Sequence, residues 1–283
     1  MLTPKIVLTK SATERFRLAG GAQPLILVPV EVNDQGPFEF ILDTGAGTSL
    51  LSTELAARLQ MKILGSKQGH TAGGAVSVSL AKVDSICIAQ ARLADLDVGI
   101  VDLKPIGTAV GARIDGDLGY NFLKNYRISI DYEKSQLRLE DAHRVDVFHR
   151  GVQTEIPLRL ASPAKPLILV EVFANRKGPF QFAIDTGTST TAITPELAKR
   201  IGVKASPVGE ANTGGEKVAV TAGVVESFMV GGAKADRLQV IVADFFNALS
   251  EAVGAKLDGI VGYNFLRSYN VVIDYPNERL SLI

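Results

Sequence analysis

The sequence is poor in the residue types that most often carry metal, redox or disulfide chemistry. It has no tryptophan, one cysteine and three histidines among its 283 residues. The single Cys87 cannot form an intrachain disulfide, and so few histidines and cysteines provide no metal-ligand cluster. The sequence also lacks the motifs of a nucleophile elbow, a phosphate-binding loop and a dinucleotide site. We therefore expect an activity that uses no metal and no cofactor.

The sequence also lacks a net charge and a long apolar run. Thirty basic and thirty acidic residues cancel, which argues against nucleic acid or an anionic membrane surface as a partner. No stretch approaches the ~20 apolar residues of a transmembrane helix. Residues 1–8 lack the apolar core of a signal peptide. We expect a soluble protein, and the sequence leaves its localisation open.

The sequence is rich in glycine and in aliphatic segments, and it contains an internal repeat. Its 27 glycines and many Val/Ile-rich segments favour a mainly β protein. Residues 36–59 match residues 178–201 at 12 of 24 positions, and residues 115–132 match residues 258–275 at 11 of 18. Two matches in the same order indicate two homologous lobes. We expect the chain to divide into an N-terminal lobe at 1–142, a polar connector at 143–153 and a C-terminal lobe at 154–283.

The triplet Asp-Thr-Gly occurs once in each repeat, at residues 43–45 and 185–187. Each copy follows a short apolar segment, 38–42 or 180–184, with the pattern of a β-strand. A lone Asp-Thr-Gly is usually just a turn. Two copies at the ends of matched strands instead indicate one carboxylate pair assembled from the two halves.

A pair of carboxyl groups can activate water without further help. At a separation of about 3 Å both groups cannot ionise cheaply, so they share one proton. The ionised member can take a proton from water while the protonated member hydrogen-bonds a carbonyl oxygen. Thr188, three positions after Asp185, can donate a hydrogen bond to its carboxylate, whereas the matching Ala46 offers no hydroxyl to Asp43. We therefore expect Asp185 to be the ionised member and Asp43 to carry the shared proton.

These motifs resemble those of the retropepsin/pepsin clan of aspartic proteases, and most closely a bacterial-type single-chain tandem of two retropepsin-like units. The resemblance covers both halves of the chain. It implies a mainly β, bilobal acid-protease fold, in which two homologous closed-barrel-like lobes with short helices flank a catalytic cleft. It also implies an endopeptidase that hydrolyses extended polypeptides as a monomer, the two lobes forming an intramolecular pseudo-dimer.

The resemblance assigns roles to individual residues. Asp43 and Asp185 are the catalytic pair. Thr44 and Thr186 support them through hydrogen bonds between the lobes, and Thr188 also supports the pair. The residues implied to bind substrate are Gly45 and Gly187, whose carbonyls face the substrate backbone, and the tips of two glycine-rich hairpin flaps, Ala72, Gly73 and Gly74 in the first lobe and Thr213, Gly214 and Gly215 in the second.

The first lobe departs from the family pattern at one position. In the family two apolar residues precede a glycine and pack beneath the catalytic loop, as Ile260 and Val261 do here. Asp117 stands where Ile260 stands in the other repeat. Because an unpaired buried carboxylate is costly, we expect Asp117 either to turn outward or to alter the first lobe locally. Near the N-terminus, residues 5–8 could complete a sheet shared between the lobes.

Two other hypotheses remain open from the sequence. The chain could be a catalytically silent peptide-binding module of the same fold. It could also be a protease that pairs equivalent lobes from two chains rather than the two lobes of one chain.

Overall fold

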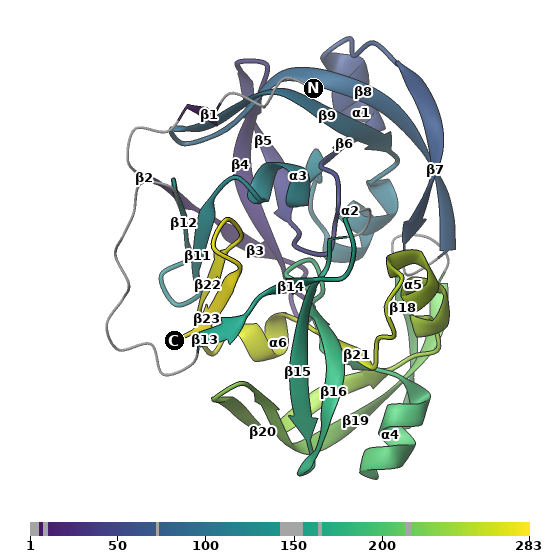
Figure 1. Ribbon diagram of the computed structural model, residues 1–283. Coiled ribbons are helices and arrows are strands. Elements are labelled where there is room, and N and C mark those ends of the chain that lie inside the picture. Colours follow the sequence, from purple (N-terminus) through teal and green to yellow (C-terminus); the bar gives the residue numbers. More distant parts are fainter. Residues whose placement is uncertain (1–5, 8–10, 72–73, 142–154, 164–165, 213–216) are drawn as a thin grey trace.

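The computed structural model describes residues 6–7, 11–71, 74–141, 155–163, 166–212 and 217–283. The fold is mainly β, as the sequence predicted, and consists of two barrels and a sheet that joins them. Figure 1 shows the first barrel above, the second below and the joining sheet to one side. No helix in the described ranges is long and apolar enough to cross a membrane.

The first barrel is a closed ring of six strands in the order β4, β5, β10, β6, β9, β8, with β8 pairing back onto β4. Its buried face is almost entirely aliphatic and aromatic. The elements of this lobe are β1 (Ile6–Val7), β3 (Arg17–Ala19), β4 (Leu25–Val32), β5 (Gln35–Leu42), β6 (Leu50–Ser52), α1 (Thr53–Arg58), β7 (Gly65–Thr71), β8 (Gly74–Ile88), β9 (Ala91–Val101), α2 (Lys104–Val110), β10 (Gly116–Leu118) and α3 (Tyr120–Leu123).

The second barrel repeats the first strand for strand. Its ring runs β15, β16, β21, β17, β20, β19, with β19 pairing back onto β15. The elements of this lobe are β14 (Arg159–Leu160), β15 (Ile168–Ala174), β16 (Lys177–Ile184), β17 (Ala192–Ile193), α4 (Pro195–Ile201), β18 (Ser206–Asn212), β19 (Lys217–Val230), β20 (Ala233–Val242), α5 (Phe246–Val253), β21 (Gly259–Val261) and α6 (Tyr263–Leu266).

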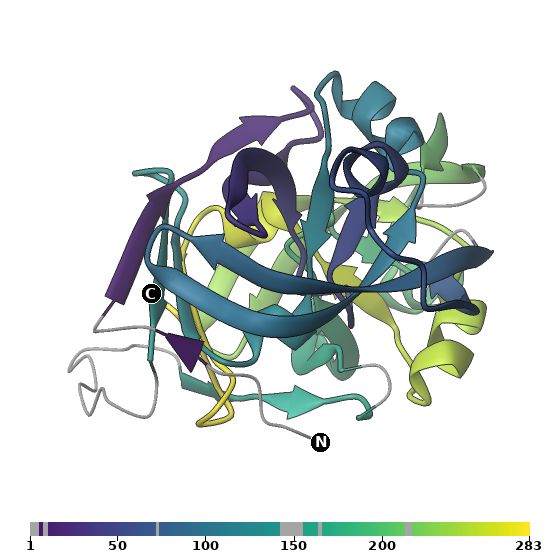
Figure 2. The same ribbon diagram turned by 90° about the horizontal axis from the view of Figure 1, so that it is seen from above.

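A six-stranded antiparallel sheet joins the two barrels (Figures 1 and 2). Its strands, in spatial order, are β13 (Glu155–Pro157), β23 (Arg279–Leu282), β22 (Asn270–Asp274), β11 (Arg127–Asp131), β12 (Gln136–Glu140) and β2 (Ser11–Arg15). At its centre Ser129 lies opposite Val272, its own equivalent in the other repeat. Equivalent residues that face each other define a pseudo-two-fold axis, which therefore passes through this sheet.

The expectation that residues 5–8 complete the joining sheet is wrong. Within that segment the structure describes Ile6–Val7, which pairs with Leu93 and Arg92 of β9 in the first lobe. The edge of the joining sheet is instead formed by β2, which pairs with β12 and buries Ala12 in the core. The strand at the sheet edge is mostly polar and has no apolar pattern that would identify it from the sequence, so the available sheet edges decide which segment pairs there.

The short helices after the Asp-Thr-Gly turns begin where the sequence predicts. Ser52 and Thr194 are their N-caps, and each side chain accepts a hydrogen bond from a backbone amide in the first turn. Pro195 occupies the first position of α4, and Glu54 and Glu196 lie at the positive helix ends. These caps fix the path of the chain that leaves each Asp-Thr-Gly turn.

Candidate active site

The two Asp-Thr-Gly turns meet across the pseudo-two-fold axis. Asp43 directly follows β5 and its amide donates to the carbonyl of Leu118 on β10, at 3.2 Å. Asp185 follows β16 and donates in the same way to Val261 on β21, at 3.1 Å. Because both strands are held in closed barrels, the carboxyl groups are delivered from two rigid elements.

Each carboxyl group lies against the glycine of the opposite turn. A methyl group on Gly45 would lie 2.8 Å from the carboxyl carbon of Asp185, and one on Gly187 would lie 2.6 Å from that of Asp43. The two carboxyl groups are themselves hydrogen-bonded to each other. Glycine is therefore required at both positions because a side chain would occupy the space of the opposite carboxyl group.

The two threonines form the hydrogen bonds between lobes that the family resemblance implied. The Thr44 hydroxyl donates to the carbonyl of Ile184 at 3.2 Å, and the Thr186 hydroxyl donates to the carbonyl of Leu42 at 2.7 Å. Each hydroxyl also accepts a hydrogen bond from the amide of the other threonine, at 3.1 Å in both directions. Both residues are fully buried. The four bonds fix one catalytic turn against the other.

A sequence model of the aspartyl protease family matches the chain twice, over residues 28–122 and residues 170–265. The chain belongs to this family. The two matches contain one Asp-Thr-Gly turn each and correspond to a tandem of two retropepsin-like units. No curated protein matches the chain.

Hydrogen-bond donors are distributed differently on the two carboxyl groups of this aspartyl protease. Asp43 Oδ1 accepts both the Gly45 amide at 2.6 Å and the Ala46 amide at 3.0 Å. Asp185 accepts the Gly187 amide on Oδ1 at 2.8 Å and the Thr188 hydroxyl on Oδ2 at 2.7 Å. Thr188 therefore lies where the sequence predicted, and both oxygens of Asp185 have a donor that stabilises negative charge.

The environment of Asp43 favours its protonated form. Burial raises the pKa of Asp43 well above its usual value, and the negative charges of Asp117 and Asp185 raise it further. The amide of Gly45 acts in the opposite direction, but more weakly. The surroundings of Asp43 therefore favour Asp43 over Asp185 as the carrier of a proton shared by the two groups.

Asp117 is neither turned outward nor part of a distorted strand, so both expectations for it are wrong. Its side chain is buried, and β10 pairs with β5 in the register that β21 adopts with β16. The carboxyl group faces the catalytic turn, where it is hydrogen-bonded to Asp43. A protonated carboxyl group can be buried at much lower cost than a carboxylate, which explains why the strand accommodates it.

The structure also reveals supporting residues that the sequence did not single out. The Ser49 hydroxyl donates to the Asn121 side chain at 2.8 Å and accepts the amide of Gly119 at 3.1 Å. Thr191 and Asn264 make the same contacts in the second lobe, the Thr191 hydroxyl accepting the amide of Gly262. These bonds tie the catalytic turn to the strand beneath it. The sequence did contain a signal for these residues, because a hydroxyl residue at 49 and 191 and an asparagine at 121 and 264 recur at equivalent positions of the repeat.

Both lobes carry a long hairpin at the positions predicted for the flaps. It is formed by β7 and β8 in the first lobe and by β18 and β19 in the second. Gly74 begins β8 and pairs with Thr71. The remaining predicted tip residues lie outside the described residues; they are Ala72, Gly73, Thr213, Gly214 and Gly215. Strand β7 lies against α5 of the second lobe, so the first hairpin extends across the boundary between the lobes (Figure 1).

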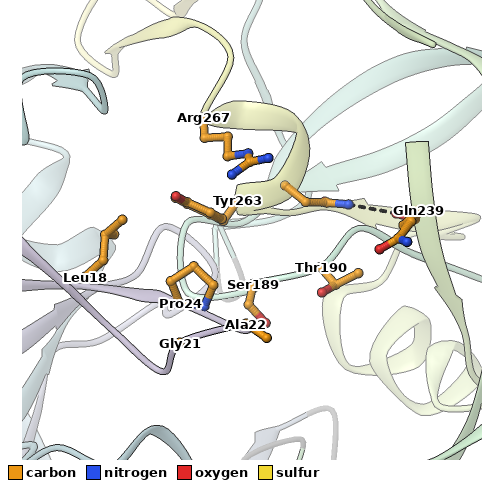
Figure 3. Close-up of a pocket in the computed structure, with 10 residues that line it drawn as sticks. Leu18, Gly21, Ala22, Pro24, Ser189, Thr190, Gln239, Tyr263 and Arg267 are labelled. Atoms are coloured by element: carbon orange, nitrogen blue, oxygen red, sulfur yellow. Dashed lines mark hydrogen bonds between the residues drawn. The ribbon is translucent and has the colours of Figure 1, made fainter. Parts of the chain in front are cut away.

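A pocket of about 390 Å³ lies between the lobes without including either aspartate. Figure 3 shows Pro24 and neighbouring residues of the turn between β3 and β4 on one side, with Tyr263 and Arg267 at α6 on the other. Ser189 and Thr190, on the loop that follows Asp185, complete the wall. The pocket therefore lies to one side of the two aspartates and is not formed by them.

Proposed function

We propose that the protein is an aspartic endopeptidase in which Asp43 and Asp185 together activate one water molecule. One observation carries the proposal: each carboxyl group packs against the glycine of the other turn, inside a reciprocal hydrogen-bond network between the lobes. Membership of the aspartyl protease family supports proteolysis in general. The paired carboxyl groups supply the chemistry that proteolysis needs.

The asymmetry of the pair suggests a division of labour. Asp185, whose two oxygens accept hydrogen bonds from Gly187 and Thr188, acts as the general base and takes a proton from water. The water oxygen bonds to the carbonyl carbon of the scissile peptide. Asp43 gives its proton to the carbonyl oxygen as negative charge develops there. Asp185 then passes the proton it received to the leaving nitrogen and the carbon–nitrogen bond breaks, while one hydroxyl of the intermediate returns its proton to Asp43 as the product carboxylic acid forms.

The proposed substrate is an extended polypeptide bound between the lobes. The carbonyl groups of Gly45 and Gly187, next to the pair, are placed to accept hydrogen bonds from the substrate backbone. We propose that the two hairpins close over the bound chain with their tips at residues 72–74 and 213–215. Two hairpins of similar length favour closure from both lobes rather than from one.

We also propose that one chain is sufficient. The N-terminal lobe at 1–142 and the C-terminal lobe at 154–283, joined by residues 143–153, would each contribute one aspartate. The joining sheet supports this arrangement because three strands of the second lobe and three of the first lie side by side in it within one chain. A monomer should therefore be the active form.

The proposal is tested by digesting a peptide library with the wild type and with Asp43→Asn and Asp185→Asn. We expect both variants to lose proteolysis by at least about 10³-fold, because general acid–base catalysis needs both carboxyl groups. Asp84→Asn, on the exposed face of β8, is the matched control and should cleave like the wild type. Retained cleavage in either active-site variant would exclude the two-carboxyl mechanism.

The same variants separate the two alternatives. Binding of peptides by the wild type without any cleavage would identify a silent peptide-binding module. A protease that pairs equivalent lobes of two chains would keep one intact pair of aspartates in the variant that alters the other lobe, and that variant would still cleave. We expect neither variant to cleave, and light scattering of the active enzyme should give the mass of one chain.

A further inference from the structure

At one position beneath the Asp-Thr-Gly turns, the two barrels differ in polarity. Ile260, in the middle of β21, packs in an apolar cluster with Ala183 and Ala192. Asp117 occupies the same place in β10, with Ile41 of β5 and Leu50 of β6 as its cross-strand neighbours. Its exposed fraction is 7%, close to the 6% of Ile260. A carboxyl group thus replaces an isoleucine without a change in burial or register.

Few groups on the surrounding elements can balance a charge on Asp117. Its Oδ1 has no hydrogen-bond partner among the described residues. The strands on either side present Ile41 and Leu50, and the facing ends of β5 and β16 present only Asp43 and Asp185. No lysine, arginine or histidine in the described ranges is among the groups that shift the pKa of Asp43 or Asp117.

Two further titratable groups lie close by without neutralising the cluster. Asp115, at the start of the same segment, is held by Arg113 at 2.7 Å and by the amide of Glu39 at 3.1 Å. Tyr275, just after β22, has its pKa raised by burial and therefore carries no charge of its own. Asp117 is consequently the third member of a cluster of three carboxyl groups, in which Asp117 is buried and Asp43 and Asp185 are half-buried.

Such a cluster favours the protonated forms of Asp43 and Asp117. Burial opposes the charged form of both groups, and the negative charge of Asp185 opposes it further. The pKa of Asp117 is raised to about 8, mainly by burial; the hydrogen bond with Asp43 lowers it, and the charge of Asp185 raises it. If Asp117 loses its proton, its negative charge lies beside Asp43 and opposes ionisation of that residue.

We propose that Asp117 is a positioning residue that holds a proton at neutral pH and, once it loses that proton, places a negative charge beside Asp43. That charge keeps the shared proton of the catalytic pair on Asp43 and the negative charge on Asp185. This proposal rests on the proposed function of the pair. Asp117 touches no substrate in this role and acts through Asp43. Its consequence is an enzyme that retains its active protonation state to a higher pH than the pair alone would allow.

The first test is the pH dependence of kcat/KM for Asp117→Asn, which keeps the size of the side chain but cannot ionise. We expect the alkaline limb to move to lower pH by roughly one unit, because the charge that opposes ionisation of Asp43 is gone. Asp117→Ile, which copies the second lobe, should move it in the same direction. Asp115→Asn makes the same chemical change two residues away and should leave the limb in place. An unchanged limb in both Asp117 variants would overturn the proposal.

The second test needs no activity. An aspartate has a pKa of about 3.9 in an unfolded chain, and Asp117 has one of about 8 in the folded protein. Between these values the folded state binds the extra proton, so the stability of the wild type falls as pH rises. The Tm of Asp117→Asn relative to the wild type should therefore rise from pH 4 to pH 8, whereas that of Asp115→Asn should not.

The two tests separate failure of this proposal from failure of the proposed function. A wild type that cleaves nothing, with a Tm difference that grows with pH, would refute proteolysis and leave the bound proton in place. A Tm difference that stays constant from pH 4 to pH 8 would refute the proton on Asp117, whatever the activity.

Discussion

The hydrogen bonds that Thr44 and Thr186 make between the two Asp-Thr-Gly turns should contribute strongly to both stability and activity. Replacing a single hydroxyl in this network should therefore have a large effect. Thr44→Val replaces a hydroxyl by a methyl group of similar volume, so packing is preserved while hydrogen bonding is removed. The substitution deletes the bond to the Ile184 carbonyl at 3.2 Å and the acceptor of the Thr186 amide at 3.1 Å. Both groups left behind are buried between the lobes, where water cannot replace the lost partner.

The expected cost follows from these two bonds. A buried hydrogen bond contributes about 1 kcal/mol net, and a buried group left without a partner costs about 1–3 kcal/mol. Thr44→Val should therefore lower the free energy of unfolding by about 2–4 kcal/mol. Thr186→Val removes the equivalent bonds and should cost a similar amount. Because the two residues share one hydrogen-bond network, the loss in the double variant should differ from the sum of the two single losses. Each single loss is already a large part of the stability of a typical protein, about 5–15 kcal/mol.

Urea unfolding followed by circular dichroism measures this loss, and kcat/KM measures its effect on the pair. We expect activity to fall by about 10²-fold in Thr44→Val, because a small misplacement of a catalytic group is sufficient. Thr13→Val, exposed on β2, is the control and should change stability by less than about 0.5 kcal/mol. A cost for Thr44→Val as small as that of the control would refute the reasoning.

Two further predictions concern the neighbours of the pair. In Gly187→Ala the new methyl group would lie 2.6 Å from the carboxyl carbon of Asp43, so kcat should fall by about 10²-fold. The control Gly65→Ala has open space around the new methyl group and should not change kcat. Equal kcat values for the two variants would contradict the close approach of Gly187 to Asp43. Thr188→Val removes the donor at 2.7 Å from Asp185 Oδ2. Since this donor favours the charged carboxylate, the acid limb of the kcat/KM profile should move to higher pH, and an unmoved limb would show that the hydroxyl is dispensable.

Much of the fold was predictable because the repeat is read directly from the sequence. Equal offsets between matched segments required equivalent barrels, and the apolar strands before each Asp-Thr-Gly placed both aspartates at strand ends. Local chemistry also predicted the N-caps Ser52 and Thr194, whose role depends only on residues within one turn. These predictions succeed because the interactions that decide them are local or are repeated.

Other features depended on contacts between distant segments. The sequence shows that Asp117 replaces an apolar residue, but the cost of burying it depends on carboxyl groups that arrive from three strands. Asn121 was not singled out from the sequence, and its amide oxygen accepts hydrogen bonds from the amide and the hydroxyl of Ser49, which lies 72 residues earlier. Similarly, the pattern of residues 6–7 does not specify which sheet edge they join. Composition and periodicity do not encode such choices.

The position of each residue relative to the pseudo-two-fold axis explains where the two halves have diverged. Thr44 and Thr186 accept hydrogen bonds from each other's amides, so a change in one leaves an unpaired group in the other lobe. By contrast, Asp117 and Ile260 pack against strands of their own barrels, so either could change without requiring a change in the other. The same holds for the positions of Ala46 and Thr188.

Both differences bias the carboxyl pair in the same direction. Thr188 stabilises negative charge on Asp185, while Asp117 opposes negative charge on Asp43. Two identical chains related by an exact two-fold axis could not carry either difference, because each residue would appear on both sides of the pair. A single chain with two unequal lobes can assign the proton to one aspartate and the charge to the other before the substrate binds. Fusion of the repeats thus permits a division of roles that a symmetric dimer has to make anew in each catalytic cycle.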